Sequence, residues 1–250
     1  MSSKGSWIKG KTALVTGGAK RLGRAISLAL ASHGANVIIH YGKSQSEASE
    51  LAQEIQKYGV KSWIMSANLS QENDVDGLFN KALTLASPIQ ILINNASIFN
   101  ESRLSNFSID ELVDNIQVNS MSPLILARGL AKQKTDGAII NFLDTRITEY
   151  DRKHAAYHLS KRMLFDLTRM MALEFAPLIR VNGIAPGLIL PPPGKDISYL
   201  EELAPTNPLK KVGNPEEIIN AVIFLLNSQF VTGQVIFVDG GYHMKGSTYG

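Results

Sequence analysis

The sequence of 250 residues contains no cysteine. This absence excludes disulfide bonds and cysteine-based metal sites, and it is compatible with a reducing compartment. No apolar run reaches the ~18 residues that suggest a membrane span, and residues 1–10 lack the apolar stretch of a signal peptide. We therefore predict a cytoplasmic protein with no membrane partner.

The chain also lacks a strong excess of either charge, since the formal net charge is only +3. No run of lysine or arginine marks a nucleic-acid surface, so the pI of about 9.0 is attributed to scattered lysines and no nucleic-acid partner is predicted. No cluster of histidines and carboxylates has metal-ligand spacing, so we predict no catalytic metal. His154 and His158 are interpreted as loop or helix-surface residues.

Short apolar, β-prone runs alternate with segments of helical periodicity along the whole chain. Strands that are apolar almost throughout are typical of a parallel sheet covered on both faces. The pattern predicts an α/β fold, a single doubly wound Rossmann domain with a seven-stranded parallel sheet flanked by helices. Strands are expected at 12–16, 36–40, 61–65, 89–93, 137–143, 179–184 and 234–238, and helices at 21–33, 46–58, 71–86, 109–133 (with a bend near Pro123), 150–175 and 215–226.

The chain shows no linker or internal repeat, so we predict one domain over residues 11–243. Residues 1–10 are expected to be a flexible start that includes Trp7, and 244–250 a C-terminal tail. The least regular segment, 186–214, carries the run Pro191-Pro192-Pro193-Gly194. Because a long loop without regular structure is usually functional or mobile, 188–213 is predicted to cover a substrate.

A glycine-rich turn, Thr16 to Gly23, lies between the first strand and the first helix. Glycines there let the backbone approach a pyrophosphate, whose charge the helix N-terminus favours. An NAD-binding fold is expected to carry an acidic residue at the end of the second strand. Here that strand ends in the run from His40 to Ser44, which has no acid, and Arg21, Lys43 and Ser44 offer cations and a hydroxyl instead. We predict NADP(H) rather than NAD(H).

Tyr157 and Lys161 are four residues apart in a predicted helix and therefore lie on one helix face. A lysine ammonium beside a phenol favours the phenolate and makes the phenol a better proton donor near neutral pH. This arrangement suits general acid catalysis on a substrate that receives a hydride.

These residues, together with Asn94-Asn95-Ala96, Asn119, Pro186-Gly187 and Asp239-Gly240-Gly241, resemble the short-chain dehydrogenase/reductase family over nearly the whole chain. Two positions depart from the general pattern. Arg21 stands where the family usually has glycine, and Asp144 stands in place of the catalytic serine. With the run from His40 to Ser44 and the run from Asn95 to Phe99, both departures resemble the pteridine reductases and the bacterial dihydrofolate or dihydromonapterin reductases.

The resemblance implies catalytic roles for Asp144, Tyr157, Lys161 and Asn119, the last keeping the active-site helix open to water. It implies that Asn68, where many relatives have Asp, accepts from the adenine amino group, and that Phe99 stacks on a pterin. The implied substrate site is Arg21, Ser97, Phe99, Asp144, Tyr157 and Leu188. The implied cofactor site is Gly17, Lys20, Arg21, Leu22, Gly23, His40, Tyr41, Lys43, Ser44, Asn68, Leu69, Asn95, Ala96, Ser97, Tyr157, Lys161, Pro186, Gly187 and Leu188.

Asp144 bears on the choice of substrate. A carboxylate suits a carbonyl oxygen poorly, whereas a cyclic C=N substrate has N–H groups that can donate to it. The hypothesis is hydride transfer from NADPH to a pterin or dihydrofolate-type C=N bond, with Tyr157 as proton donor and Asp144 assisting; alternatively, Asp144 only caps its loop. Two other functions remain open, an NADPH-dependent carbonyl reductase of the 3-oxoacyl thioester type and a non-catalytic NADP sensor. The resemblance also implies a homotetramer built through the long helices and the last strand.

Overall fold

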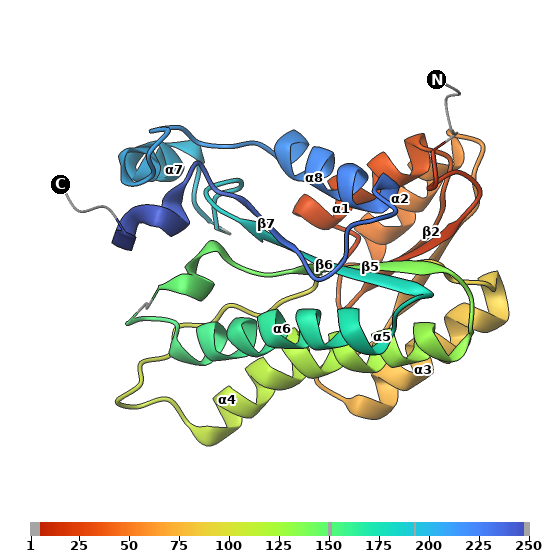
Figure 1. The fold of residues 1–250 in the computed structure, drawn as a ribbon, viewed down its shortest axis with the longest axis horizontal. Coiled ribbons are helices and arrows are strands. Elements are labelled where there is room, and N and C mark those ends of the chain that lie inside the picture. The colour runs from red at the N-terminus through yellow and green to blue at the C-terminus, as the bar shows by residue number, and fades with distance from the viewer. Residues whose placement is uncertain (1–5, 150–151, 193, 248–250) are drawn as a thin grey trace.

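The structure is a computed structural model that describes residues 6–149, 152–192 and 194–247. Seven parallel strands form one sheet in the order β3-β2-β1-β4-β5-β6-β7, which confirms the predicted fold class (Figure 1). The strands are β1 (Thr12–Thr16), β2 (Asn36–Tyr41), β3 (Ser62–Ser66), β4 (Ile91–Asn94), β5 (Gly137–Phe142), β6 (Ile179–Pro186) and β7 (Val235–Val238).

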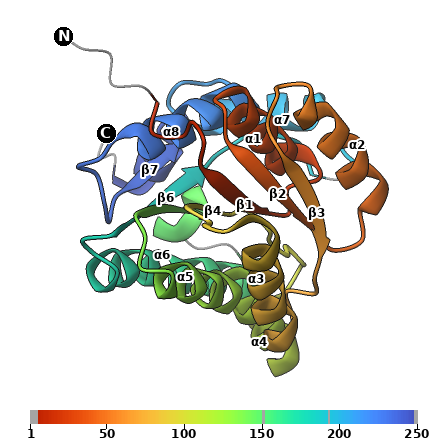
Figure 2. The same ribbon diagram turned by 90° about the vertical axis from the view of Figure 1, so that its right-hand side faces the viewer.

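Helices cover both faces of the sheet (Figures 1 and 2). One layer contains α1 (Arg21–Ser32), α2 (Gln45–Gln56) and α8 (Pro215–Asn227), and the other contains α3 (Glu72–Ala86), α4 (Ile109–Ile116), α5 (Ser122–Lys132) and α6 (Ala155–Glu174). Successive side chains of a strand point to opposite faces, so Val15 packs under the first layer and its neighbour Leu14 under the second. This burial on two faces is why the strands are apolar almost throughout.

The direction of winding reverses at β1, which pairs with both β2 and β4. In such a sheet a crevice opens outside the carboxyl ends of the strands at the point of reversal. The loops that follow β1, β2, β4 and β5 all leave the sheet at this edge. The fold therefore brings the glycine-rich turn, the end of β2 and the loop after Asn94 together.

The helix predicted over 109–133 is interrupted. α4 ends at Ile116, a π-helical turn spans Gln117–Met121, and α5 begins at Ser122. Pro123 is the second residue of α5, and because the π-helical turn continues directly into α5, its missing N–H leaves one helical hydrogen bond unmade. The irregularity thus lies before the proline and contains Asn119, and π-turns occur frequently at functional sites.

Near both chain ends and in the 188–213 segment, the described residues include packed or helical parts. Ile8 is fully buried and Trp7 bonds to Asn227, so the start is packed from residue 6, whereas residues 1–5 lie outside the described residues. The substrate segment contains α7 (Ile197–Leu203) and a 3-10 helix, Ala204–Thr206. A further 3-10 helix, Tyr242–Ser247, occupies most of the predicted tail, and residues 248–250 lie outside the described part.

Smaller differences concern where elements begin. The helix predicted over 150–175 begins at Ala155, and residues 150 and 151 lie outside the described residues. Pro193 of the proline run is likewise outside them. Among the helices of the described residues, none is long and apolar enough to cross a membrane.

Candidate active site and cofactor cleft

The turn between β1 and α1 depends on close backbone contacts. Gly17 adopts φ +60°, and a Cβ on Gly23 would lie 2.1 Å from the carbonyl oxygen of Gly17, so only glycine fits position 23. The Nδ2 of Asn95 donates to the carbonyl oxygens of Thr16 (3.0 Å) and Gly17 (3.1 Å). Asn95 therefore shapes the turn, and the N-terminus of α1 is left open for a phosphate group.

His40, at the end of β2, forms hydrogen bonds that fix the same turn. Its Nδ1 accepts a hydrogen bond from the backbone N–H of Gly17 (3.1 Å), so its Nε2 carries the proton and donates to the carbonyl of Ala67 (3.2 Å). Burial lowers the pKa of His40, outweighing the bond to Ala67, which agrees with a neutral ring. The residue predicted to contact the cofactor thus also fixes the backbone that would cradle it.

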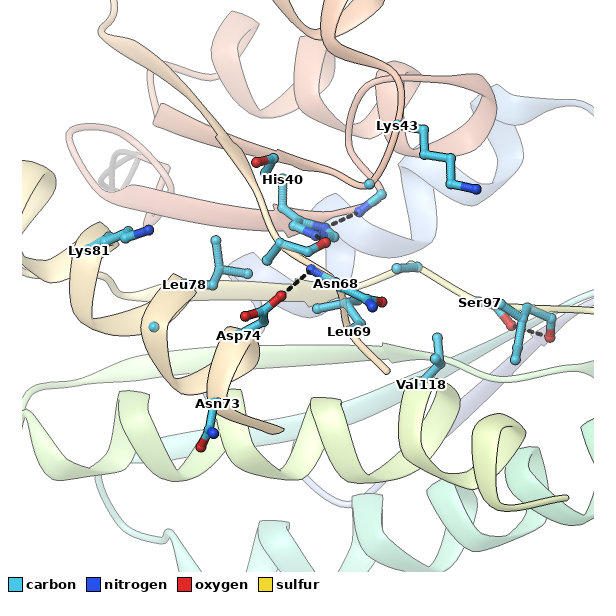
Figure 3. Close-up of a pocket in the computed structure, with 17 residues that line it drawn as sticks. His40, Lys43, Asn68, Leu69, Asn73, Asp74, Leu78, Lys81, Ser97 and Val118 are labelled. Atoms are coloured by element: carbon cyan, nitrogen blue, oxygen red, sulfur yellow. Dashed lines mark hydrogen bonds between the residues drawn. The ribbon is translucent and has the colours of Figure 1, made fainter. Parts of the chain in front are cut away.

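A cavity of about 820 Å³ opens beside this turn (Figure 3). Its walls come from the glycine-rich turn, the ends of β2 and β3, the start of α3 and the loop after β4. Seven of the predicted cofactor residues line it, namely Gly17, His40, Lys43, Asn68, Leu69, Ala96 and Ser97. The volume and the concave shape suit a nucleotide.

Three cations of the predicted cofactor site have different surroundings. Lys43 is exposed and lines the cavity directly after β2. Lys20 instead forms an ion pair with Glu47 of α2. Arg21 adopts φ +52°, in the left-handed region, which explains why the resembling family usually has glycine at this position. Its Nη2 donates to the carbonyl of Pro191 (2.5 Å). Of the three, Lys43 is best placed to meet a phosphate at the end of β2.

Asn68 differs from the expectation that its oxygen accepts from adenine. Its Oδ1 already accepts from the N–H of Ser70 (3.1 Å) and from the hydroxyl of Ser70 (2.9 Å), which uses both lone pairs. Another acceptor near this end of the cavity is the carboxylate of Asp74, whose Oδ2 accepts from the N–H of Asn68 (3.3 Å). Sequence reasoning missed Asp74, because an acid in the first turn of a helix is a common stabilising feature.

Asn119 lies in the π-helical turn and is fully buried. Its Oδ1 accepts from the hydroxyl of Ser97 (3.0 Å) and the N–H of Ile98 (2.9 Å), and its Nδ2 donates to the carbonyl of Ile98 (3.1 Å) and the hydroxyl of Ser160 (3.0 Å). Ser160 in turn donates to the carbonyl of Tyr157 (2.6 Å). Asn119 therefore ties the loop after β4 to the helix that carries Tyr157, while the predicted water relay to Lys161 stays a prediction.

Asp144, Tyr157 and Lys161 meet at the carboxyl end of β5. The phenol of Tyr157 donates to Oδ2 of Asp144 (2.9 Å), and the other oxygen of Asp144 accepts from the N–H of Arg146 (2.7 Å). Lys161 donates to the carbonyl of Phe142 (2.7 Å), and its Nζ lies 5.8 Å from the centroid of the Tyr157 ring. Asp144 thus caps its loop and also binds the phenol, so it does not only cap the loop, while its assistance in proton transfer stays a prediction.

The pKa values around the phenol differ from the sequence expectation. Burial and the Asp144 carboxylate raise the pKa of Tyr157 well above its ordinary value, although Arg146 opposes them weakly. Burial lowers the pKa of Lys161 to about 8, against the opposing effect of Asp144. The phenol pKa therefore lies on the other side of its ordinary value from the one expected beside Lys161, because burial and a carboxylate at hydrogen-bond distance both raise it. Tyr157 holds its proton at neutral pH.

An aromatic cluster covers the phenol. Phe99, about half exposed, contacts the Tyr157 ring edge-on with centroids 4.6 Å apart and stacks on His154 at 4.0 Å. His158 is buried and packs against Tyr157 with centroids 5.1 Å apart, so its assignment to the helix surface was wrong. The predicted stacking of Phe99 on a substrate stays a prediction, but Phe99 lies where a planar ring beside Tyr157 would meet it.

The segment after β6 closes the cleft on its other side. A Cβ on Gly187 would lie 2.6 Å from Cα of Asp239, so Gly187 allows the close approach of the segment that follows β7. Leu188 is half-buried and lines a second cavity of about 400 Å³ with residues of β7. In the described ranges, no group of three or more His, Asp or Glu side chains could hold a metal ion.

A family model described as enoyl-(acyl carrier protein) reductase matches residues 4–243. The chain therefore belongs to this family of short-chain dehydrogenase/reductases. Among relatives, the 3-oxoacyl-[acyl-carrier-protein] reductase FabG of Aquifex aeolicus is 34% identical over 248 residues, covering 94% of this chain and 98% of the relative. The 2-dehydro-3-deoxy-D-gluconate 5-dehydrogenase of Formosa agariphila is 32% identical over 246 residues, covering 94% and 93%.

Solved structures resemble the chain over a similar length. FolM alternative dihydrofolate reductase 1 from Brucella canis, complexed with NADP, superposes with a TM-score of 0.88 and 35% identity, covering 95% of this chain and 96% of that one. A blue fluorescent protein from a metagenomic library, in complex with NADPH, has a TM-score of 0.87 and 27% identity, covering 94% and 98%. The chain is an NADP-dependent oxidoreductase.

The cleft fits this cofactor on its own geometry. The glycine positions leave no room for a Cβ where the backbone would approach the pyrophosphate. The end of β2 presents Lys43 and no carboxylate, which suits a 2′-phosphate. Gly17, Lys43, Asp74, Ala96 and Ser97 line the cavity where the nucleotide is expected. The assignment of Tyr157, Lys161, Pro186, Gly187 and Leu188 to the reactive end of the cofactor stays a prediction.

Proposed function

We propose that this protein uses NADPH to reduce a C=N bond in a pterin or dihydrofolate-type substrate, with Tyr157 as the proton donor. The observation that carries the proposal is the hydrogen bond from the Tyr157 phenol to the Asp144 carboxylate. FolM of Brucella canis, whose name includes dihydrofolate reductase, also has this fold with 35% identity. NADPH, when bound, supplies the hydride.

The carboxylate favours one class of substrate over another. Reduction of a carbonyl builds negative charge on oxygen, which an adjacent carboxylate destabilises. A cyclic C=N group instead takes a proton on nitrogen, and the N–H groups of its ring can donate to Asp144. Tyr157 delivers its proton to that nitrogen, Asp144 orients the phenol, and Phe99 offers an aromatic face beside it.

The test is a substrate panel in which NADPH oxidation is followed by absorbance. We expect turnover with dihydrobiopterin, dihydromonapterin or dihydrofolate, and rates with acetoacetyl thioesters lower by at least about tenfold in kcat/KM. Faster turnover of the thioesters would support a carbonyl reductase. NADPH binding without turnover of any compound would support a sensor.

A carbonyl reductase is the second candidate, and the FabG relative at 34% identity favours it. Asp144→Ser distinguishes the two, because serine is the usual hydroxyl donor to a carbonyl oxygen in the resembling family. If the pterin proposal is right, Asp144→Ser lowers dihydropterin turnover. An increase in that turnover would contradict the role assigned to Asp144.

A further inference from the structure

The C-terminal segment reaches the loop that carries Asp144. Asp239 follows β7 and is buried. Its Oδ2 accepts hydrogen bonds from the Thr145 hydroxyl, from the backbone N–H of His243 (2.8 Å) and from Nδ1 of the His243 ring (2.9 Å), while its Oδ1 accepts from the N–H of Gly241 (2.9 Å). Thr145 is the residue directly after Asp144. One buried carboxylate therefore joins two 3-10 helices that pack together, Thr145–Thr148 and Tyr242–Ser247 (Figure 1).

The position of Asp239 is itself restricted. A Cβ on Gly187 would lie 2.6 Å from the Cα of Asp239, so the two backbones are in close contact. Next to it, Gly240 adopts φ +64° and would bring a Cβ within 2.6 Å of the side-chain oxygen of Asn207. The His243 ring also stacks on Phe237 of β7 at 4.0 Å between centroids. These close contacts restrict the position of Asp239, so a segment that bonds to its carboxylate is restrained too.

Besides the bond to Asp239, Ile147 of the Asp144 loop packs in a buried apolar cluster and Arg146 lies over the Tyr242 ring. The 3-10 helix that begins at Thr145 contains only four residues, and such short helices have poor hydrogen-bond geometry. Asp144 accepts from the N–H of Arg146 within this helix and from the Tyr157 phenol outside it. The Thr145 hydroxyl donates to Asp239, and this bond restrains the position of the residue directly after Asp144.

We propose that Asp239 and Thr145 are positioning residues, which hold the Asp144 carboxylate at hydrogen-bond distance from Tyr157. Hydrogen bonds keep Asp239 ionised: burial would raise its pKa, but the bonds from Thr145, His243 and Gly241 lower it. A charged acceptor makes the bond to Thr145 stronger than a neutral one. The inference rests on the proposed roles of Asp144 and Tyr157.

The first test is Thr145→Val, which removes the hydroxyl and keeps the shape. We expect kcat to fall about tenfold with the Kd for NADPH unchanged, because the loss concerns the geometry of the proton donor. Thr145→Ser keeps the hydroxyl and should restore kcat to within about threefold of the wild type. Thr148→Val makes the same substitution at an exposed position of the same helix and should leave kcat within about twofold. An equal loss in Thr145→Ser or Thr148→Val would overturn the proposal.

A double-mutant cycle separates positioning from general stability. With Asp144→Asn already present, Thr145→Val should change kcat by less than about twofold, because the group being positioned is gone. A further tenfold loss in that background would show that Thr145 acts independently of Asp144 and would overturn the proposal. If Thr145→Val does not fold, Thr145→Ala is measured against the same criteria.

A third measurement needs no substrate and so stands even if pterins are not reduced. Amide hydrogen exchange reports the holding of the loop directly. In Thr145→Val, the amides of Arg146 and Ile147, which bond to Asp144, should exchange faster than in the wild type, while those of β5 should not change. Unchanged exchange at Arg146 and Ile147 would overturn the positioning role. Absent pterin turnover would instead overturn the proposed function.

Discussion

Asp144 acts on two ionisable side chains in the same direction. Its carboxylate raises the pKa of Tyr157 in addition to burial, and it raises the pKa of Lys161 against burial, which leaves that pKa at about 8. Both groups must hold their protons for Tyr157 to act as the acid. We expect Asp144→Asn to lower both pKa values, so the alkaline limb of kcat/KM should move to lower pH by about one unit.

The measurement is kcat/KM across the alkaline range with the substrate that the wild type reduces fastest. Asp166→Asn is the matched control, because it removes a carboxylate from an exposed position of the same helix, α6. The control profile should overlay that of the wild type. A limb in Asp144→Asn that stays in place or moves to higher pH would contradict the charge argument.

Lys43 and Lys81 both line the nucleotide cavity, but they lie apart in it (Figure 3). Only Lys43 follows β2, where a 2′-phosphate is expected. We expect Lys43→Ala to weaken NADPH binding about tenfold and to leave NADH binding within about twofold, since a charge-assisted bond to phosphate is lost. Lys81→Ala removes the same charge and should weaken NADPH binding less. Equal effects of the two variants in a calorimetric titration would show that only the overall charge of the cavity matters.

Residue identities at the site were largely predictable, but their electrostatics were not. Helical spacing placed Tyr157 and Lys161 on one face, and the missing acid after β2 indicated NADP, both of which are local features. The direction of the Tyr157 pKa shift depends on Asp144, which arrives from the end of β5, and on burial by the whole fold. Likewise, a histidine at the end of a strand looks the same in sequence whether it contacts a ligand or, as His40 does, accepts from Gly17.

Asn119 in the π-helical turn between α4 and α5 makes four hydrogen bonds of 3.1 Å or less to Ser97, Ile98 and Ser160. Asn119→Ala removes these bonds, including those to the fully buried Ser160 and the half-buried Ile98. We expect the free energy of unfolding to fall by about 3 kcal/mol and kcat to fall as well, because Ser160 bonds to the backbone of Tyr157.

Asn115→Ala is the control for this turn. Asn115 is buried one turn earlier, donates one hydrogen bond to the carbonyl of Glu111 (2.9 Å) and accepts a long one from Nδ2 of Asn119 (3.5 Å). Asn115→Ala should lower the free energy of unfolding, measured with urea, by about 1 kcal/mol and should affect kcat less than Asn119→Ala does. If the two variants were equally destabilised, the interpretation of Asn119 as the holder of the π-turn would be wrong.

The elements of regular periodicity were predictable and the irregular ones were not. All seven strands were predicted from apolar runs, because burial on both faces leaves a continuous signal. The π-turn at Gln117–Met121 was missed, because it interrupts the helical period by too little to disturb the pattern. α7 was missed because it has seven residues and follows a proline-rich run.

At the scale of the whole molecule, long-range contacts set the boundaries of the packed domain. Trp7 donates to Asp136, and the Lys11 ammonium both pairs with Asp136 and lies over the Trp7 ring. Partners so far apart in the chain leave no periodic signal, so residues 6–10 looked flexible in sequence. The same reason hid the contact between Asp239 and Thr145, which are separated by most of the chain's second half.

α4 and α6 pack side by side and leave large apolar side chains on the surface, notably Val113, Met170 and Leu173. Leu173 is 84% exposed and lies on the same helix face as Met170. We propose that a second copy of the chain covers this face in a homotetramer. Light scattering should give about four times the chain mass of 27.3 kDa, and Leu173→Asp should reduce it, because a charge would be buried in the interface.

Leu85→Asp is the matched control for the assembly. Leu85 is exposed in the last turn of α3, outside the α4–α6 face, so the same substitution there should leave the mass unchanged. Because Tyr157 and Lys161 lie on α6, loss of the assembly in Leu173→Asp should also lower kcat, and raising the protein concentration should partly restore it by mass action. A wild-type protein that scatters as a monomer would show that these exposed side chains are not an interface between copies.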